Sequence, residues 1–182
     1  MRLAVLGGCG AWPTADQACS GYLVDHAGFR LLIDPGYATL PRLLRHGTVD
    51  AVDAVLISHG HPDHCADLNP LLRARGLSDD PPPPLPVHAP HGAVDAVLAL
   101  DKPRMLANAY RLHEFTPGDR FDIGPYTVDT WLAGHYAHQA GAARLMLTHL
   151  WPGTAPAAAR EAAAETFAHP IAIAAPGVVT HL

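Results

Sequence analysis

The chain has 182 residues, of which 49% are hydrophobic and 16% are charged, so it can bury a substantial core in a single domain, residues 1–182. Its formal net charge is −5 and its positive residues are scattered, which argues against the basic stripe of a nucleic-acid-binding protein. No apolar run approaches 18 residues, so no membrane-spanning helix is expected.

The first residues, MRLAVLGGCG, contain one arginine and a very short apolar run, and they predict a first strand rather than a signal peptide. The three cysteines, Cys9, Cys19 and Cys65, are odd in number and lack Cys-x-x-Cys spacing. This usage is typical of a reducing compartment, so we expect a cytoplasmic protein without disulfide bonds.

Hydrophobic patterning in the first half of the chain favours strands that alternate with short helices. Ala27-Gly28 is a hairpin signal between two strands, and Gly76 marks the end of a helix that has Pro62 and Asp63 in its first turn. In chain order, we predict strands at 2–6, 20–26 and 29–36, helical spacing at 41–46, a strand at 52–58, a helix at 62–76, a polyproline-like loop at 78–84, a strand at 85–90 and a helix through 91–100.

The second half predicts a β-meander over 111–132, the end of a helix at 135–141, a strand at 144–149, and an alanine-rich helix over 154–168 with Thr154 as its N-cap. Two short strands close the chain. Meanders at both ends with alternating elements between them indicate an α/β fold, in which helices pack outside a pair of facing sheets.

The stretch SHGHPDH, residues 58–64, places three histidines and a carboxylate directly after an apolar strand. His59 and His61 are two residues apart, so in an extended segment their imidazoles point the same way. Asp63 and His64 begin the following helix and can be aimed at a second, neighbouring point. Neutral imidazole and carboxylate are ligands of zinc-like hydrolytic ions. Chance rarely produces this spacing, so we interpret it as a metal site.

This stretch resembles the His-x-His-x-Asp-His signature of the metallo-β-lactamase superfamily. The segments GGCGAWPT, SGYLVDHAGFRLLIDPG and LMLTHLWPGT are similar to the ribonuclease Z-like and phosphodiesterase-like branch, especially its small bacterial metallo-hydrolases. The resemblance covers most of the chain and implies an αββα sandwich of the metallo-β-lactamase type. The signature is specific for the superfamily and much less specific for the substrate.

The resemblance also implies a ligand set. His59 and His61 would hold a first ion, Asp63 and His64 a second, and His149, at the end of the strand RLMLTH, would complete the second site. The ions would be one or two Zn²⁺, with Mn²⁺ or iron as alternatives.

Two further residues have two interpretations each. Asp34 matches a family aspartate that accepts a hydrogen bond from a ligand imidazole, or it is a turn-forming residue before Pro35. His135 is either the middle-region ligand of the first ion or a helix residue.

The sequence departs from the family pattern in its middle. The bridging Gly-Asp pair is not found between Trp131 and His149, and Gly118-Asp119 comes too early to replace it. A stretch on the order of 50–60 residues is absent by comparison with the family, although domain sizes permit a shorter chain. The expected fold is therefore an αββα sandwich that lacks a central segment, and the missing bridge puts activity in doubt.

The resemblance implies a metallo-hydrolase, most simply a phosphodiesterase that acts through a hydroxide bound to metal on a small diester such as a cyclic nucleotide, or on an RNA 3′ end. Asp63 would assist proton transfer, and His149 or His135 would protonate the leaving group. Low basic content favours the small diester over long RNA. The alternatives are a lactone, thioester or β-lactam hydrolase, and a truncated, inactive metal-binding relative. A homodimer is compatible with the resemblance, because relatives often dimerise.

The remaining candidates have plainer interpretations. Cys65 is predicted to face the apolar side of its helix. Trp12 and Trp151 either line the mouth of the site or pack as ordinary aromatic residues. Surface or strand-end roles are predicted for the other histidines considered: His88, His91, His113 and His138.

Overall fold

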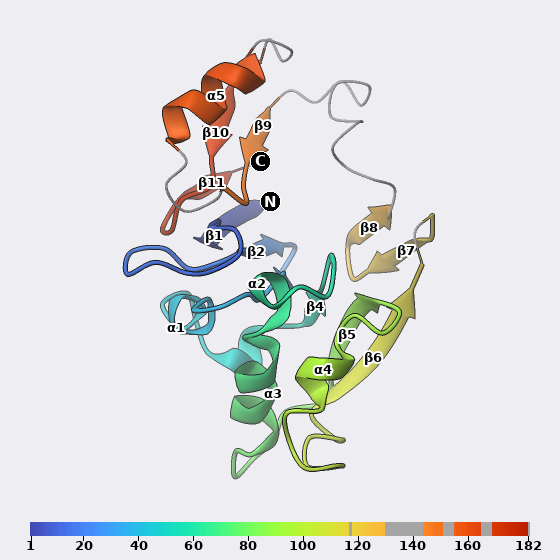
Figure 1. Ribbon diagram of the computed structural model, residues 1–182. Helices are drawn as coiled ribbons and strands as arrows, with labels where there is room; N and C mark the ends of the chain where they lie inside the picture. The colour runs from blue at the N-terminus through green and yellow to red at the C-terminus, as the bar shows by residue number, and fades with distance from the viewer. Residues whose placement is uncertain (117, 130–143, 151–154, 165–168, 182) are drawn as a thin grey trace.

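The computed structural model describes residues 1–116, 118–129, 144–150, 155–164 and 169–181 (Figure 1). A mixed sheet of seven strands, in the order β11-β1-β2-β3-β4-β5-β6, forms the centre of the molecule. Neighbouring strands from β3 to β6 run parallel, and the other pairs are antiparallel. The strands are β1 (Arg2–Gly7), β2 (Gly21–His26), β3 (Phe29–Ile33), β4 (Ala54–Leu56), β5 (Leu85–Pro90), β6 (Tyr110–Phe115) and β11 (Val179–His181).

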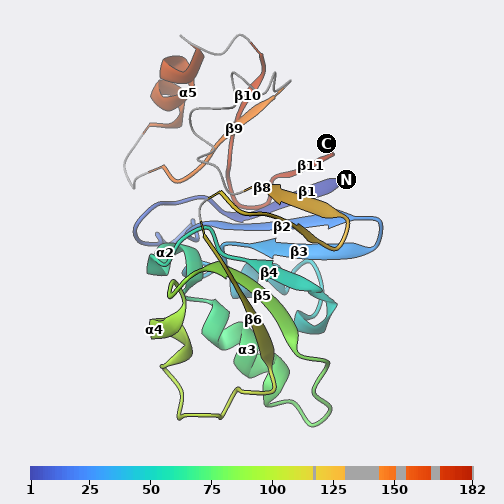
Figure 2. The ribbon, with the colours of Figure 1, turned by 90° about the vertical axis from the view of Figure 1, so that its right-hand side faces the viewer.

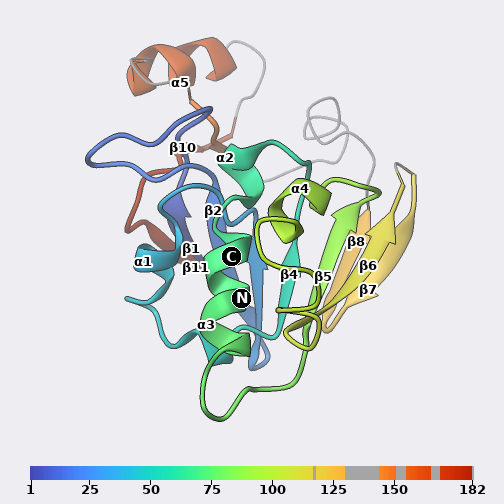
Figure 3. The same ribbon diagram turned by 60° about the horizontal axis from the view of Figure 1, so that its bottom comes forward.

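The helices of the first half cover one face of this sheet, as Figure 3 shows. The main core lies between these helices and the sheet. There the fully buried Val55 and Val87 of the strands, and Ile57 just after β4, meet Leu68 and Leu72. The helical elements are α1 (Leu40–Leu43), the 3₁₀ turn η1 (Val49–Ala51), α2 (Pro62–Cys65), α3 (Leu68–Gly76) and α4 (Asp95–Leu98).

The opposite face of the sheet, here called the outer face, carries a separate antiparallel hairpin of β7 (Arg120–Ile123) and β8 (Tyr126–Asp129). Buried Ile123 packs there against Leu31 and Ala54. A second pair, β9 (Leu145–Leu147) and β10 (Ile171–Ile173), runs parallel and lies with α5 (Pro156–Ala164) beyond β1 and β11 (Figure 2). No helix in the described residues is long and apolar enough to cross a membrane.

The predicted α/β class is confirmed, as is the hairpin at Ala27-Gly28, where φ is +53° and +80°. Such left-handed pairs suit tight hairpin turns. Most elements are shorter than predicted. The predicted helix end at 135–141 and the N-cap Thr154 lie outside the described residues, as does the region expected to lack the central segment.

Two sequence predictions were wrong. The helix predicted over 62–76 is two helices, because the amide of Asp67 donates to the carbonyl of Pro35 at 2.8 Å and leaves the helical ladder. The predicted meander does not form either, since β6 pairs in parallel with β5 while β7 pairs with β8. The apolar residues of β7 and β8 are buried against the outer face instead of extending the sheet.

Candidate metal centre

Asp34 lies where β3 ends, beside the first residues after β4, because the carboxyl ends of parallel strands meet at one edge of the sheet. Its carboxylate accepts hydrogen bonds from the amide and the hydroxyl of Ser58, each at 2.6 Å, and lies 2.9 Å from Nδ1 of His64. Asp34 is only 5% exposed. Asp34 therefore fixes the corner between β4 and the following helix through Ser58, and it fixes the orientation of the His64 imidazole.

The His64 imidazole is fixed by this contact. The Asp34 carboxylate accepts a hydrogen bond from the N–H at Nδ1, which places the lone pair of the ring on Nε2. Nε2 is buried, has no hydrogen-bond partner among the described residues and lies 3.6 Å from Oδ2 of Asp63. A buried nitrogen lone pair without a donor is rare in folded proteins, and a metal ion would satisfy it.

Asp63 completes the contact with a residue from far along the chain. Its Oδ2 accepts a hydrogen bond from the Ala11 amide at 2.8 Å and lies 2.9 Å from Nε2 of His149. Ligand atoms of Asp63, His64 and His149 all lie within 4.8 Å of one another, so among the described residues they form a group that can hold one ion. The donor set of two imidazoles and a carboxylate fits Zn²⁺ and similar ions.

The electrostatics keep Asp63 ionised. Burial alone would raise its pKa, but the Ala11 hydrogen bond, the electrostatic effect of the nearby His64 imidazole and the contact with His149 together lower the pKa of this carboxyl below its usual value. Asp63 therefore carries its negative charge at neutral pH, as a metal ligand must.

Backbone strain is concentrated at this cluster. Ala11, Asp34 and His149 all have φ between +49° and +64°, a region that costs non-glycine residues free energy. Gly36 allows the chain after β3 to approach α2, because a Cβ at this position would lie 1.9 Å from the carbonyl oxygen of Asp63. Such strain is found at sites whose geometry the rest of the fold imposes.

His59 and His61 lie beside this group. The ring centroids of His59 and His64 are 3.9 Å apart, and those of His59 and His61 are 4.8 Å apart. Burial, followed by the charge of His64, lowers the pKa of His59, so its imidazole is neutral at pH 7 and able to bind metal. These two residues could serve a second ion next to the first.

The structure also places two other residues that the sequence singled out, Cys65 and Trp12. Cys65 is fully buried, as predicted, with Sγ 3.3 Å from the carbonyl oxygen of His61. Trp12 is 52% exposed and follows the Ala11 amide that binds Asp63. His135, His138 and Trp151 lie outside the described residues.

Sequence reasoning missed Ala11 and Ser58. The contribution of Ala11 is a backbone amide, which every residue except proline carries, so no side-chain pattern could reveal it. Ser58 had a usable signal, because it is a hydroxyl at the strand end, directly before the first histidine of the motif.

Comparisons with known proteins agree with this geometry. The profile of the metallo-beta-lactamase superfamily matches residues 15–147. The probable metallo-hydrolase YhfI of Bacillus subtilis is 41% identical over 75 residues, which are 41% of this chain and 31% of that protein. Ribonuclease Z of Methanopyrus kandleri is 37% identical over 131 residues, 71% of this chain and 45% of that enzyme. The chain thus spans less than half the length of these curated relatives.

Solved structures show the same fold. The crystal structure of YhfI from Bacillus subtilis aligns with a TM-score of 0.82 at 23% identity, covering 99% of each chain. The short form of human tRNase Z aligns with a TM-score of 0.68 at 16% identity, covering 100% of this chain and 99% of that one. From the profile match and the shared fold, we conclude that the chain belongs to the metallo-beta-lactamase superfamily.

Proposed function

We propose that this protein is a metal-dependent phosphodiesterase that acts on a small phosphodiester, such as a cyclic nucleotide, or on an RNA 3′ end. The observation that carries the proposal is the buried Nε2 of His64, which lacks a hydrogen-bond partner among the described residues and faces Asp63 and His149. A bound divalent ion would lower the pKa of water to near neutrality and neutralise charge on phosphoryl oxygens.

The residues of the chain then have separate tasks. Asp63, His64 and His149 would hold one ion, with His59 and His61 beside it for a second. Asp34 keeps the proton on Nδ1 of His64, so that Nε2 is available to the metal.

Proton transfer falls to two members of the group. Asp63 is ionised and can accept a proton at its carboxylate. The His149 side chain is 39% exposed, so it is the part of the three-residue group that a substrate meets. With Nε2 on the ion, its Nδ1–H would be the proton donor to the leaving alkoxide.

The choice of substrate rests on similarity and charge. The ribonuclease Z relatives act on RNA, as their name states, which favours a phosphodiester. The 12 lysines and arginines of this chain are outnumbered by 17 acidic residues, and long RNA would require more phosphate contacts. A small diester is the better match. A single domain, a cytoplasmic location and a homodimer stay predictions from the sequence.

The test is an activity comparison with metal analysis. Protein loaded with zinc or manganese is assayed on bis-p-nitrophenyl phosphate and on a panel of thioesters and lactones. We expect diester hydrolysis that His64→Ala lowers on the order of 10³-fold, because an ion supplies several kcal/mol of transition-state stabilisation. His26→Ala, which removes an exposed histidine at the end of β2, is the matched control.

Two results would contradict the proposal. Hydrolysis of thioesters or lactones without diester hydrolysis would redirect it to the other enzyme class. One ion or none per chain, with no hydrolysis of any substrate, would indicate the inactive metal-binding relative.

A further inference from the structure

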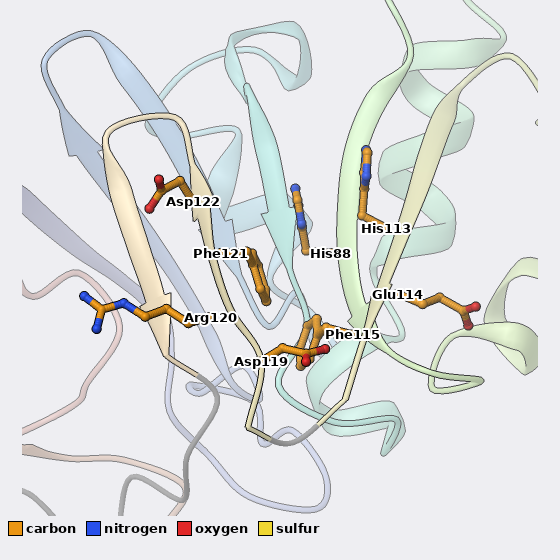
Figure 4. A pocket seen from close by; sticks show the side chains of 8 residues that line it. All are labelled: His88, His113, Glu114, Phe115, Asp119, Arg120, Phe121 and Asp122. Atoms are coloured by element: carbon orange, nitrogen blue, oxygen red, sulfur yellow. The ribbon is translucent and has the colours of Figure 1, made fainter.

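A cavity of about 340 Å³ lies on the outer face of the large sheet, between β5–β6 and β7 (Figure 4). Four of the residues that line it carry rings: His88, His113, Phe115 and Phe121. Val87 and Ala89 belong to the core under the helices, so His88, between them on β5, faces the opposite side. A volume of this size suits part of a small ligand.

Three of these rings form a stack. His88 and His113 are register partners on β5 and β6, with ring centroids 4.7 Å apart and planes inclined by 14°. Phe121 lies on the other side of His88, with centroids 5.5 Å apart and planes inclined by 9°. His113 is thus the terminal ring of the stack. It is exposed and stands on β6, the last strand of the sheet in the described part of the chain.

The middle ring of the stack, His88, is kept neutral. Burial, followed by the charge of His113, lowers the pKa of His88, so protonation of the middle ring is disfavoured. Parallel rings at the edge of a cavity can stack with one further planar ring, in the way that aromatic side chains bind nucleic-acid bases.

The charges around the cavity oppose binding of a phosphate group. Three carboxylates, those of Glu114, Asp119 and Asp122, line it together with one guanidinium, that of Arg120. The Arg120 side chain extends away from the two histidines (Figure 4). A neutral ring that carries N–H donors suits this setting better than an anion does.

The cavity lies on strands next to the one that leads into the candidate metal centre. Leu56, His88 and His113 lie in register, and the metal-binding corner begins two residues beyond Leu56. At normal strand spacing, β4 and β6 are about 10 Å apart. A diester held at the metal centre could therefore place an attached ring near His113.

The turn after β5 connects the two places. The Gly92 amide donates to Glu114 of the cavity at 2.9 Å. On its other side this turn packs against the metal-binding corner, because a Cβ on Gly60 would lie 2.5 Å from the carbonyl oxygen of Ala93.

We propose that this cavity binds the nucleobase of the phosphodiester substrate against the ring stack, in contact with His113. This inference rests on the proposed function, because it names the group attached to the diester. It assigns an orientation to the substrate, with the phosphate at Asp63 and His64 and the base at the acidic, ring-lined cavity.

The experiment uses adenosine, which has a base but no phosphate and cannot be hydrolysed as a diester. Adenosine is titrated into the zinc-loaded protein while the imidazole resonances are followed by NMR and the dissociation constant by calorimetry. We expect saturable shifts of the His88 and His113 resonances. Ribose 5-phosphate, which has a phosphate but no base, should leave both unchanged.

Variants test the stacking itself. His113→Ala should weaken adenosine binding at least about tenfold, whereas His113→Phe, which keeps a ring, should stay within about threefold of the natural protein. His26→Ala is the control, and unfolding midpoints verify that each variant is folded.

The inference is overturned if adenosine causes no saturable shift, if ribose 5-phosphate causes the same shift, or if His113→Phe loses binding as fully as His113→Ala. Its failure is separable from that of the proposed function. Adenosine binding without diesterase activity would support the nucleobase site and contradict the proposed function. Diesterase activity without any effect of adenosine on His113 would support the proposed function and contradict the nucleobase site.

Discussion

Two groups of histidines lie toward the same edge of the seven-stranded sheet, and their neighbours give them different chemistry. His64 and His149 meet the carboxylates of Asp34 and Asp63 through their ring nitrogens, whereas His88 contacts the rings beside it face to face. A carboxylate on one nitrogen fixes the tautomer and frees the other nitrogen for an ion. Stacking instead leaves a ring face for a ligand. The partner of an imidazole, more than its place in the sheet, thus decides what it can bind.

The largest effect should come from removing the charge at the centre of the first group. Asp63→Asn leaves a neutral amide between Ala11 and His149, so we expect loss of bound zinc and a fall in diesterase activity on the order of 10³-fold. Metal analysis and kinetics measure both. Asp79→Asn, in the exposed loop at 78–84, is the control. Full zinc content in Asp63→Asn would show that the ion is held elsewhere.

A smaller effect on metal affinity is expected from Asp34, which contacts His64 rather than the ion itself. Asp34→Asn keeps the shape of the side chain but removes the charge that orients His64, and losing such a partner typically weakens metal affinity 10–100-fold. Competition with a chromophoric chelator measures the affinity. Asp80→Asn, in the exposed loop at 78–84, serves as the control. Equal affinity in the natural protein and Asp34→Asn would mean that the Asp34–His64 contact is only structural.

Acid should destabilise the metal-free protein through both groups. Burial is the main cause that lowers the pKa of His59, beside the first group, and of His88, in the second, from 6.5. Between the folded and unfolded pKa values the unfolded chain binds more protons, so this stabilisation is complete above pH 6.5 and is lost as pH falls through the folded values. Urea unfolding in chelator should give a lower midpoint at about pH 5.5 than at about pH 7.5. A midpoint that rises on acidification would contradict these shifts.

The smallest expected effect on zinc binding is that of a change in the ring stack, and it tests whether the two groups of histidines act independently. His113→Ala alters the ring stack and leaves Asp34, Asp63 and His64 untouched, so zinc content and zinc affinity should equal those of the natural protein. Metal analysis after gel filtration provides the measurement. Loss of zinc in this variant would mean that the two groups of histidines form a single site.

The strand-to-helix corner of the candidate metal site could be predicted from sequence because its residues are local. SHGHPDH follows an apolar run, and one strand end turning into a helix brings its members together whatever the rest of the chain does. Asp34 could be anticipated as well, because it ends a recognisable strand before Pro35. These inferences need only strand and helix periodicity.

The ring stack could not be predicted in this way. His88 and His113 become neighbours only through the register of β5 with β6, which the sequence pattern did not reveal, and the predicted meander would have paired β6 with β7 instead. Long-range contacts made by backbone atoms were equally hidden. The Ala11 amide on Asp63 and the Asp67 amide on Pro35 both depend on the tertiary fold.

The central claim is that the corner after β4, joined by His149, holds a divalent ion. Anomalous diffraction at the zinc edge from a crystal soaked in zinc tests it most directly. We predict a strong peak coordinated by Asp63 Oδ2, His64 Nε2 and His149 Nε2. A map with no peak there, in which these three side chains point away from one another, would contradict the account.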